Sequence, residues 1–358
     1  MRGAKRPIAV DLFCGAGGLA LGLVEAGFNV ALAADSWDVS LKSYSANFRH
    51  PAIAADLGLV TAGDIRSQLG DTDIDFVVGG PPCQGFSIQR IGDDADPRND
   101  LVLKFGELIC QLRPRMFLME NVPGLLGKRG LPIFNLFVKA LMKGGYYLEH
   151  AVLNAADFGV PQTRRRVFVV GTRHDLFPAF AFPEPTHPPH LARTVRQAIG
   201  DLGPPWRGKQ PPGADPLHRY IGMSDLNQRR LAMIPPGGGF EDLPPEMRVT
   251  AHKNGASKIG HRAVYGRLAP DEPAATITAR FDSFTRGRFA HPWEDRNITL
   301  REGARLQAFP DSHVFFGTQE EVAAQIGNAV SPLLASVLCH AVASHLKGRR
   351  GEVAKMRA

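Results

Sequence analysis

One cysteine stands in a setting suited to nucleophilic chemistry. The segment Gly79-Gly80-Pro81-Pro82-Cys83-Gln84-Gly85-Phe86-Ser87 follows an apolar run over residues 74–78 that is typical of a strand. Because the ring of Pro82 fixes its own φ and keeps Pro81 extended, Cys83 is presented in one orientation at a strand's carboxyl end. Ligands of open α/β sheets bind at that edge. A buried structural cysteine is the alternative, and this segment alone does not decide between them.

Two further groups of polar residues occur at the ends of predicted strands. Glu120-Asn121-Val122 follows an apolar run over residues 116–119, and Gln162-Thr163-Arg164-Arg165-Arg166 precedes another over residues 167–170. If these strands share one sheet with the run before Cys83, a nucleophile, a potential acid and a basic cluster converge on one place. The pattern favours an active site.

A glycine-rich turn predicts a nucleotide-like cofactor. Asp11-Leu12-Phe13-Cys14-Gly15-Ala16-Gly17-Gly18 runs from a strand into a helix, where glycines allow close approach and the helix N-terminus offers free N–H groups. Asp35, at the end of the second strand, is placed to bind ribose hydroxyls. These features fit NAD, FAD or S-adenosylmethionine. Trp37 could stack on adenine and Asp64 could bind its amine, although Trp37 could pack in the core and Asp64 could cap a helix.

The elements that must position these residues have the order of an α/β protein. Apolar strands alternate with helical patterns over the first ~170 residues, which predicts a mostly parallel, doubly wound sheet. Strands are expected at residues 8–13, 30–34, 74–78, 116–119 and 167–170, with a helix at 16–26. Frequent proline and glycine over residues 177–245 predict a second domain rich in loops and short strands. An amphipathic helix is expected at 331–346, followed by a basic tail, 347–358, that we expect to be disordered.

Composition restricts the class of protein. The 358 residues are 44% hydrophobic and 22% charged, as in ordinary soluble proteins, and the length allows two domains. The four cysteines form neither a zinc nor a disulfide spacing, so we expect no metal and a cytoplasmic setting. No apolar run approaches the ~18 residues that span a bilayer. The formal net charge is +7, and residues 248–288 hold eight Lys or Arg against three Asp or Glu, which favours a polyanionic partner.

Taken in order, these motifs resemble the C5-cytosine DNA methyltransferase family, of the bacterial restriction-modification type. The matching segments span residues 8 to about 340: Phe13-Cys14-Gly15-Ala16-Gly17-Gly18, Gly63-Asp64-Ile65, Pro81-Pro82-Cys83-Gln84, Glu120-Asn121-Val122, Gln162-Thr163-Arg164-Arg165-Arg166, residues 299–310 and Gln325-Ile326-Gly327-Asn328-Ala329-Val330. The resemblance implies a Rossmann-like S-adenosylmethionine-dependent fold with a smaller target-recognition domain. It implies a catalytic domain at 1–190 and 325–346, a recognition domain at 191–298 and a hinge at 299–324.

The resemblance also implies a reaction. A methyl group would pass from S-adenosylmethionine, leaving S-adenosylhomocysteine, to carbon 5 of a cytosine flipped out of a short sequence in double-stranded DNA. The Cys83 thiolate would add to carbon 6, because carbon 5 is otherwise a poor nucleophile. Glu120 would supply a proton to N3, unless it forms a structural ion pair with a nearby arginine. Arg166 would hold the cytosine O2, Arg164 would orient the catalytic loop or the nucleophile, and Arg165 would lie outside the site.

Contacts to cofactor and DNA follow from the same resemblance. Cofactor contacts are expected from Asp11, Phe13, Gly15, Gly17, Gly18, Leu19, Asp35, Ser36, Trp37, Asp64, Ile65, Pro81, Leu101, Asn328, Ala329 and Val330. DNA contacts are expected from Gln84, Ser87, Gln89, Arg90, Arg98, Arg267, Thr276, Arg280, Arg286 and Arg288. The loop over residues 84–99 would close on the flipped base, and Ile88, Gln89 or Arg90 would fill or brace the vacated space. Any of the recognition-domain arginines could equally be a solvated surface charge.

Three other functions would share part of this pattern of motifs. Some relatives methylate transfer RNA, which would change only the substrate. A catalytically silent DNA-binding homologue would have lost the cysteine, the Glu-Asn-Val motif or the arginines, and all are present. A nicotinamide dehydrogenase would explain the glycine turn but neither the Pro-Pro-Cys turn nor the arginines. We therefore expect a monomeric, nucleoid-associated bacterial enzyme that acts on double-stranded DNA without membrane attachment, with a cognate restriction endonuclease as a genetic partner only.

Overall fold

The computed structural model describes residues 6–82, 100–176, 179–249 and 264–356, without side chains from residue 349 onward. The chain forms two compact units. Unit 1 comprises residues 1–154, 165–185 and 329–358, and unit 2 comprises residues 155–164 and 186–328. The chain thus crosses between the units four times, and each unit is described by itself.

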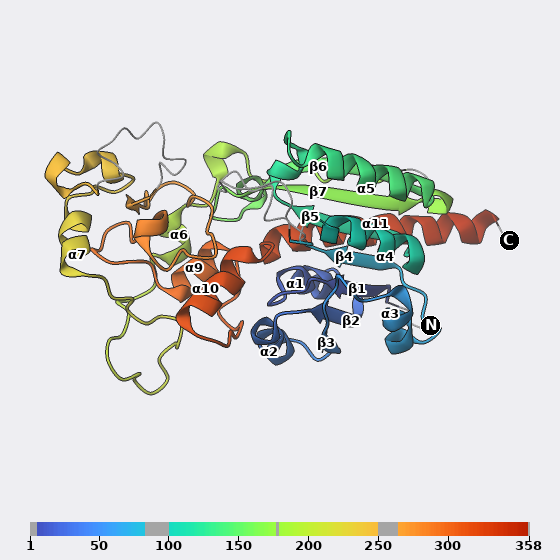
Figure 1. The fold of residues 1–358 in the computed structure, drawn as a ribbon, viewed down its shortest axis with the longest axis horizontal. Coiled ribbons are helices and arrows are strands. Elements are labelled where there is room, and N and C mark those ends of the chain that lie inside the picture. The colour runs from blue at the N-terminus through green and yellow to red at the C-terminus, as the bar shows by residue number, and fades with distance from the viewer. Residues whose placement is uncertain (1–5, 83–99, 177–178, 250–263, 357–358) are drawn as a thin grey trace. The chain divides into compact units, whose positions relative to one another are not determined.

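Unit 1 is built on a seven-stranded sheet in the order β3-β2-β1-β4-β5-β7-β6 (Figure 1). Strand β7 is antiparallel to both of its neighbours, and the other described pairings are parallel. This is the mostly parallel, Rossmann-like sheet that the sequence predicts. The strands are β1 (Ile8–Leu12), β2 (Asn29–Asp35), β3 (Ala52–Ala54), β4 (Phe76–Gly79), β5 (Met116–Asn121), β6 (Tyr146–Asn154) and β7 (Arg165–Arg173).

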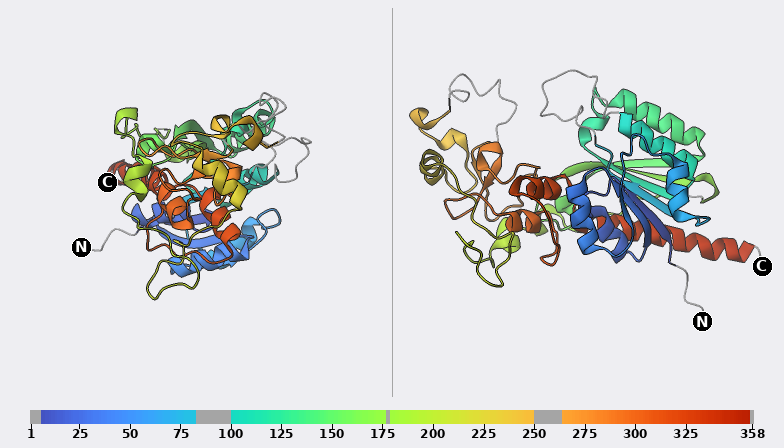
Figure 2. Two further views of the ribbon diagram at one scale, coloured as in Figure 1. Left: turned by 90° about the vertical axis from the view of Figure 1, so that its left-hand side faces the viewer. Right: turned by 60° about the horizontal axis from the view of Figure 1, so that its bottom comes forward.

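Helices cover both faces of this sheet (Figure 2), which is why the central strands β1, β4 and β5 are buried along their whole length and read as continuous apolar runs. On one face, Phe105 and Phe137 pack edge-on against Phe117 of β5. On the other, Leu41 and Tyr44 pack with Ala33 of β2. The helices of unit 1 are α1 (Gly18–Glu25), α2 (Asp38–Asn47), α3 (Ala62–Leu69), α4 (Asp100–Leu112), α5 (Leu131–Lys143) and α11 (Pro332–Met356), with 3-10 turns η3 (Pro123–Leu126) and η5 (His174–Leu176).

The direction of β7 decides what lies at the carboxyl edge of the sheet. In the antiparallel register, Asn121 of β5 lies opposite Val167 and Glu120 opposite Phe168. The first residues of β7 therefore lie beside the last residues of β5. In an all-parallel sheet the start of β7 would lie at the opposite edge, so the antiparallel pairing is what brings the arginines to the Glu-Asn-Val segment.

The C-terminal helix differs from the sequence prediction. Helix α11 runs from Pro332 to Met356, so it continues beyond residue 346, where its end was expected, into residues 347–356. Apart from two glycines, the added residues are mostly good helix formers such as Lys, Arg, Glu and Ala. Helix α11 packs closely on α1. Gly22 allows this close approach, since a Cβ at this position would lie 2.5 Å from the Ala335 carbonyl carbon.

One helical stretch, Gln319–Gly348, is long and apolar enough to cross a membrane by composition alone. However, 67% of its most apolar window is buried within the protein, and core helices of soluble proteins pass the same test. The stretch is therefore weak support for a membrane span.

Unit 2 holds little regular structure. Within its described residues the strands are β8 (Gly266–Arg267) and β9 (Arg288–Ala290), which pair in parallel. Its helices are α6 (Val195–Ile199), α7 (Asp225–Ala232), α9 (Leu300–Leu306) and α10 (Gln319–Asn328), with 3-10 turns η4 (Ala155–Phe158), η6 (Pro189–Leu191), η7 (Phe240–Asp242), η8 (Pro245–Met247) and η10 (Phe284–Arg286). Residues 299–324, predicted to be a hinge, comprise α9, the segment that follows it and the first part of α10 inside this unit.

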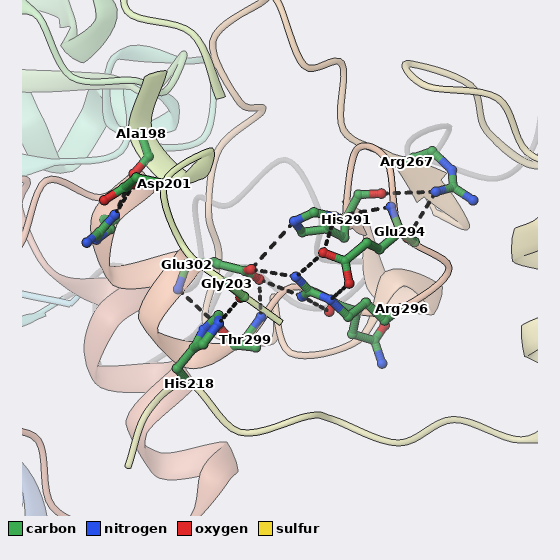
Figure 3. Close-up of polar contacts among 12 residues, drawn as sticks. Ala198, Asp201, Gly203, His218, Arg267, His291, Glu294, Arg296, Thr299 and Glu302 are labelled. Atoms are coloured by element: carbon green, nitrogen blue, oxygen red, sulfur yellow. Dashed lines mark hydrogen bonds and ion pairs between the residues drawn. The ribbon is translucent and has the colours of Figure 1, made fainter. Parts of the chain in front are cut away.

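Buried ion pairs hold unit 2 together (Figure 3). Arg296 pairs with Glu302 at 2.7 Å and with Glu294 at 3.0 Å, and the Glu302 side chain is 1% exposed. Glu302 also accepts a hydrogen bond from the backbone N–H of Thr299, which closes the capping box of α9. The Arg296 guanidinium and this hydrogen bond lower the pKa of Glu302 against the opposing effect of burial, which is the largest. The carboxylate therefore remains ionised inside the unit.

Candidate active site

The carboxyl edge of β4 and β5 carries the predicted catalytic segments. Strand β4 ends at Gly79, where a Cβ would lie 2.8 Å from the Leu12 carbonyl oxygen and 2.6 Å from the ring of Phe105. Only glycine fits this approach. The backbone then continues through Gly80, Pro81 and Pro82 toward Cys83. Cys83, the predicted nucleophile, lies outside the described residues, as do Gln84, Ser87, Gln89, Arg90 and Arg98.

An ion pair lies at the same edge. Arg166 Nε is 3.0 Å from Glu120 Oε1, with side chains that are 17% and 11% exposed. A Cβ on Gly80 would lie 3.4 Å from Glu120 Oε2, so the second carboxylate oxygen faces the backbone that leads into the Pro-Pro-Cys turn. The ion pair that sequence analysis left as an alternative to acid chemistry is thus present. Because it uses one oxygen and leaves the other facing the turn, both roles are compatible with the geometry.

Asn121 fixes the start of the Pro-Pro-Cys turn. Its Nδ2 donates to the Pro81 carbonyl oxygen at 3.0 Å, and its Oδ1 accepts from the Val122 N–H at 2.8 Å. Sequence reasoning gave this residue no role of its own. Its place directly after Glu120, at the end of a buried strand, was the available signal.

The other two arginines of the cluster have different surroundings. Arg164 is 2% exposed and donates from Nη1 to the Ile277 carbonyl oxygen at 3.0 Å, within unit 2. Its predicted action on the catalytic loop stays a prediction, because that loop is outside the described residues. Arg165 is exposed, and its carbonyl oxygen accepts from Arg166 Nη1 at 2.8 Å. Successive strand residues point to opposite faces, which separates Arg165 from Arg166.

Gln162, which sequence reasoning left without a role, joins the start of this segment to the rest of unit 2. Its Oε1 accepts from the Ile277 N–H at 2.7 Å, and its Nε2 donates to the Leu306 carbonyl oxygen at 3.2 Å and to Gln307. Thr276, a predicted DNA contact, donates from Oγ1 to the Thr163 carbonyl oxygen at 2.8 Å. The backbone before β7 is therefore fixed to the segment that holds Thr276. A glutamine in a motif of charged residues was the available signal for this role. That its side chain is fully buried cannot be read from the sequence.

The glycine turn is shaped by Asp35. Asp35 Oδ2 accepts from the Gly15 N–H at 2.8 Å, and Oδ1 accepts from the Trp37 N–H at 2.9 Å. Gly15 and Gly17 have left-handed backbone angles, φ 53° and 96°. A Cβ on Gly15 would have no atom within 4 Å, so the turn borders open space. The carboxylate predicted to bind ribose thus also orders the turn and the stacking residue.

The groups beside this turn suit a nucleotide-like ligand. Helix α1 begins after Gly17 with no side-chain cap, so its first N–H groups remain available to a ligand. A Cβ on Gly18 would lie 2.2 Å from the Val330 carbonyl oxygen, which places residues 329–330 against the helix start. Trp37 is partly exposed and Ser36 is exposed. These side chains and N–H groups match the donor set that a nucleoside with an amino-acid tail requires.

Several predicted cofactor residues are buried. Asp11 is fully buried, and this burial, together with the charge of Asp35, raises the pKa of its carboxyl well above the usual range. Its predicted contact with the cofactor stays a prediction. Leu19 and Ile65 are 4% and 1% exposed and belong to the core. Phe13 and Leu101 are partly exposed, Pro81 is buried, and Asn328 is exposed at the end of α10 in unit 2.

Asp64 is a helix cap. Its Oδ2 accepts from the Thr61 N–H at 2.8 Å and from the Thr61 hydroxyl at 2.7 Å, and these hydrogen bonds lower the pKa of Asp64. The Thr61 side chain caps α3 in return. Asp64 is exposed, so it can contact a ligand while it caps the helix.

The predicted DNA-contacting arginines of unit 2 do not behave alike. Arg267 is 4% exposed, and its guanidinium donates to the carbonyl oxygens of Leu231, Ile234, His291 and Glu294 and to the Asp295 carboxylate. Its donors are used inside the unit, and its predicted contact with DNA stays a prediction. Arg288 bonds the Gly237 carbonyl oxygen, and Arg280 lies 3.2 Å from Glu320 and 3.5 Å from Asp282. Arg286 is exposed and has no ion pair among the described residues.

Within the described part of the chain, no group of three or more His, Cys, Asp or Glu side chains is arranged to hold a metal ion.

Comparison with known proteins agrees with this site. Residues 8–344 match the family of C-5 cytosine-specific DNA methylases. The chain is 34% identical over 344 residues to the Type II methylase M.HgiDII of Herpetosiphon aurantiacus, covering 95% of this chain and 96% of that protein. It is 35% identical over 374 residues to the Type II methyltransferase M.XorII of Xanthomonas oryzae pv. oryzae, covering 92% and 83%.

The fold gives the same result. The crystal structure of a DNA modification methyltransferase encoded within a prophage of E. coli superposes with a TM-score of 0.76 at 26% identity, covering 95% of this chain and 99% of that one. The family match extends over nearly the whole chain and includes the turn, the ion pair and the glycine loop described above. The chain therefore belongs to the C-5 cytosine-specific DNA methylase family and is a DNA cytosine-5 methyltransferase.

Proposed function

We propose that this enzyme methylates carbon 5 of a cytosine flipped out of a short specific sequence in double-stranded DNA, through a covalent bond between Cys83 and carbon 6. The observation that carries the proposal is the Glu120–Arg166 ion pair beside Gly80, three residues before Cys83. An acid and a cation at the entry to a Pro-Pro-Cys turn are what addition to a pyrimidine ring requires.

The reaction divides into three steps, which are addition to carbon 6, methylation of carbon 5 and elimination. The Cys83 thiolate forms a bond to carbon 6, and the electron pair of the C5–C6 double bond moves into the ring as Glu120 donates a proton to N3. Carbon 5 would then take the methyl group that S-adenosylmethionine supplies, while the methyl–sulfur bond would break and its electron pair would stay on the sulfur of S-adenosylhomocysteine. A base removes the proton from carbon 5, the C5–C6 double bond re-forms, the sulfur leaves as thiolate, and the N3 proton returns to Glu120.

Arg166 and Asn121 would prepare the site for these steps. Arg166 holds one oxygen of Glu120, and its remaining N–H groups can donate to the cytosine O2, where charge develops. Asn121 holds the Pro81 carbonyl oxygen, which fixes the direction in which the chain approaches Cys83. Both residues lie at the end of β5 or the start of β7, so the sheet itself preorganises them.

The residues around Gly15 would hold S-adenosylmethionine. This group supplies an electrophilic methyl on sulfur. The N–H groups at the start of α1 can bind its carboxylate, Trp37 can stack on its adenine, and the Asp64 carboxylate can accept from the adenine amine. Asp35 is engaged with the Gly15 and Trp37 N–H groups through both oxygens, so it would bind ribose hydroxyls with its remaining lone pairs.

We also propose the cellular setting. The relatives named above are Type II methylases and methyltransferases, which supports a modification enzyme of a restriction-modification system with a cognate endonuclease as a genetic partner. A net charge of +7 supports a polyanionic substrate, and Arg286 is an exposed member of the predicted DNA-contacting set with no ion pair among the described residues, so it could bind a phosphate. The enzyme would act in the cytoplasm as a monomer, and flipping the base would cost a few kcal/mol of stacking and pairing.

Bisulfite sequencing tests the proposal. Plasmid DNA from a methylation-free host that expresses the chain should contain protected cytosines at one short motif. Protection should disappear with Cys83→Ser and persist with Cys110→Ser, which changes a half-buried cysteine on α4. If soluble wild-type protein binds S-adenosylmethionine but protects no DNA cytosine, the duplex-DNA proposal is wrong, and the same assay on the host's RNA would test the transfer-RNA alternative.

A further inference from the structure

The amino-terminal edge of the unit 1 sheet contains a second polar pocket, remote from the methyl-transfer edge. It has a volume of about 570 Å³ and is lined where β1, β4 and β5 begin and β7 ends. Helix α3 and the end of α4 meet the sheet here (Figure 1). Strand β5 separates this pocket from Glu120, and its six residues span about 17–20 Å. The pocket is therefore a separate site and not an extension of the active site.

Five arginines contribute to the lining: Arg6, Arg66, Arg113, Arg115 and Arg173. Two of them are neutralised. Arg115 lies 3.1 Å from Asp75 Oδ1, and Arg173 forms a bidentate pair with Asp175 at 2.7 and 2.9 Å. These two ion pairs hold the pocket wall in place. They do not neutralise the other three arginines of the lining.

The remaining three arginines have no carboxylate partner among the described residues. Arg66 donates only to two backbone carbonyl oxygens, of Thr72 at 2.9 Å and of Leu112 at 2.6 Å. The exposed side chains of Arg6 and Arg113 form no hydrogen bond or ion pair within the described structure. The one lining carboxylate left without an ion pair there is Asp73. Three cations thus face one carboxylate, and the excess charge suits an anion of charge about −2.

The backbone of Arg113 adds an independent observation. Arg113 follows the last residue of α4 with φ 51°, a left-handed angle at which glycine is the usual residue. Its N–H donates to the Ile109 carbonyl oxygen, and its own carbonyl oxygen accepts from Arg173 Nη1 at 2.8 Å. A strained position that closes a helix and still carries a guanidinium is consistent with a use for that side chain.

We propose that this arginine pocket binds a small phosphate-bearing solute, of the size and charge of a diphosphate. Guanidinium groups bind phosphate oxygens through paired N–H donors, and a concave wall of several arginines favours a compact polyanion. The unpaired arginines repel one another when the pocket is empty, so the anion relieves this repulsion and stabilises unit 1. The site does not depend on the methylation chemistry.

Inorganic pyrophosphate is the probe. Titration calorimetry at constant ionic strength should detect saturable binding to the full-length protein, and pyrophosphate should raise the thermal midpoint by a few degrees at saturation. Arg113→Gly should weaken binding at least about tenfold, the loss expected for one charge-assisted contact. Because glycine suits the left-handed angle, the variant should fold with an unchanged midpoint in the absence of pyrophosphate. Arg6→Gln, at an exposed position, should weaken binding similarly.

Two controls make the outcome decisive. Arg49→Gln removes an exposed charge that does not line the pocket, and it should leave pyrophosphate binding unchanged. If all three variants lose affinity equally, or if the wild type shows no saturation up to about 10 mM, the proposed site does not exist. If Arg113→Gly weakens binding of duplex DNA and pyrophosphate competes with that DNA, the pocket binds a nucleic-acid backbone and the small-solute proposal is wrong.

Discussion

The two units use their arginines in opposite ways. In unit 1 a seven-stranded sheet supplies the rigid frame, and Arg166 is left at its carboxyl edge beside Glu120. In unit 2 the described strands are two and three residues long. Buried arginine side chains there donate hydrogen bonds to backbone carbonyl groups, which strand pairing would satisfy in a sheet. Arg267 bonds four carbonyl oxygens, and Arg296 holds two carboxylates.

This difference shows that the role of an arginine depends on whether regular secondary structure or loops surround it. At the edge of the sheet, Arg166 pairs with Glu120 through Nε and donates from Nη1 to the carbonyl oxygen of its neighbour Arg165. Where loops predominate, buried carbonyl groups need donors from side chains, and a multi-donor arginine satisfies several at once. Arg267 and Arg286 look alike in the sequence, but Arg267 is 4% exposed and Arg286 is exposed.

The largest expected effect is at the edge of unit 1. Glu120→Gln keeps the size of the side chain but removes its charge and proton, so turnover should fall about 10²–10⁴-fold. The thermal unfolding midpoint should stay close to that of the wild type, because the pair is not needed to hold the sheet. Transfer of labelled methyl groups to DNA measures the first, and circular dichroism the second. Glu149→Gln, on the exposed face of β6, is the matched control and should be fully active.

Removing a buried ion pair from unit 2 should lower the stability of the protein strongly, although we expect a smaller effect than that of Glu120→Gln on turnover. Arg296→Met leaves Glu302 buried without its partner, which should lower the free energy of unfolding by about 3–5 kcal/mol. Glu320→Gln, which removes an ion pair with Arg280 whose side chains are 66% and 41% exposed, should lower it by less than about 1 kcal/mol. Urea unfolding followed by intrinsic tryptophan fluorescence compares them. Equal losses in the two variants would show that the buried pair is not what holds the unit.

The same network should make unit 2 sensitive to mild acid. Burial lowers the pKa of His291 to about 4 from 6.5, against the raising effect of Glu302. Between these values the unfolded chain binds a proton that the folded chain does not, so stability is lost as pH falls from 6.5 toward 4. The loss between pH 7 and pH 5 should be about 2 kcal/mol.

The test is urea unfolding at several pH values, followed by intrinsic tryptophan fluorescence, to which Trp293 contributes with its ring centroid 4.7 Å from that of His291. His291→Asn should flatten the pH dependence above pH 5. The lowered pKa values of Glu294 and Glu302 act only below their usual value of 4.5, so they leave this window unaffected. A variant that is as acid-sensitive as the wild type would assign the dependence to another group.

The smallest effect concerns the two roles given to Asp64. Thr61→Ala removes the cap of α3 and should lower the free energy of unfolding by about 1 kcal/mol, with S-adenosylmethionine affinity changed less than about twofold. Asp64→Asn should instead weaken S-adenosylmethionine binding about tenfold, because a charged acceptor is lost. Titration calorimetry separates the two. If both variants lose affinity equally, Asp64 acts through the position of α3 and not by contact.

Much of unit 1 could be predicted from the sequence, because its strands are apolar runs bounded by glycine and polar residues. The runs at 8–13 and 116–119 lie within two residues of β1 and β5. The antiparallel direction of β7 could not be predicted, since periodicity carries no information on pairing direction. In unit 2 the burial of Arg267 and Gln162 depends on long-range contacts that charge and spacing do not encode. The capping of α3 by Asp64 was one of two readings, and only the structure shows the Thr61 contacts.

The most direct test of the central claim is a covalent trap. A duplex containing the enzyme's motif with 5-fluorocytosine at the target, incubated with S-adenosylmethionine, should yield a protein–DNA adduct that survives denaturation, because carbon 5 has no proton to release. Mass spectrometry of the digested adduct should place the bond on Cys83, and Cys83→Ser should form none. An adduct at another residue, or methylation of ordinary cytosine without any trapped species, would contradict the account.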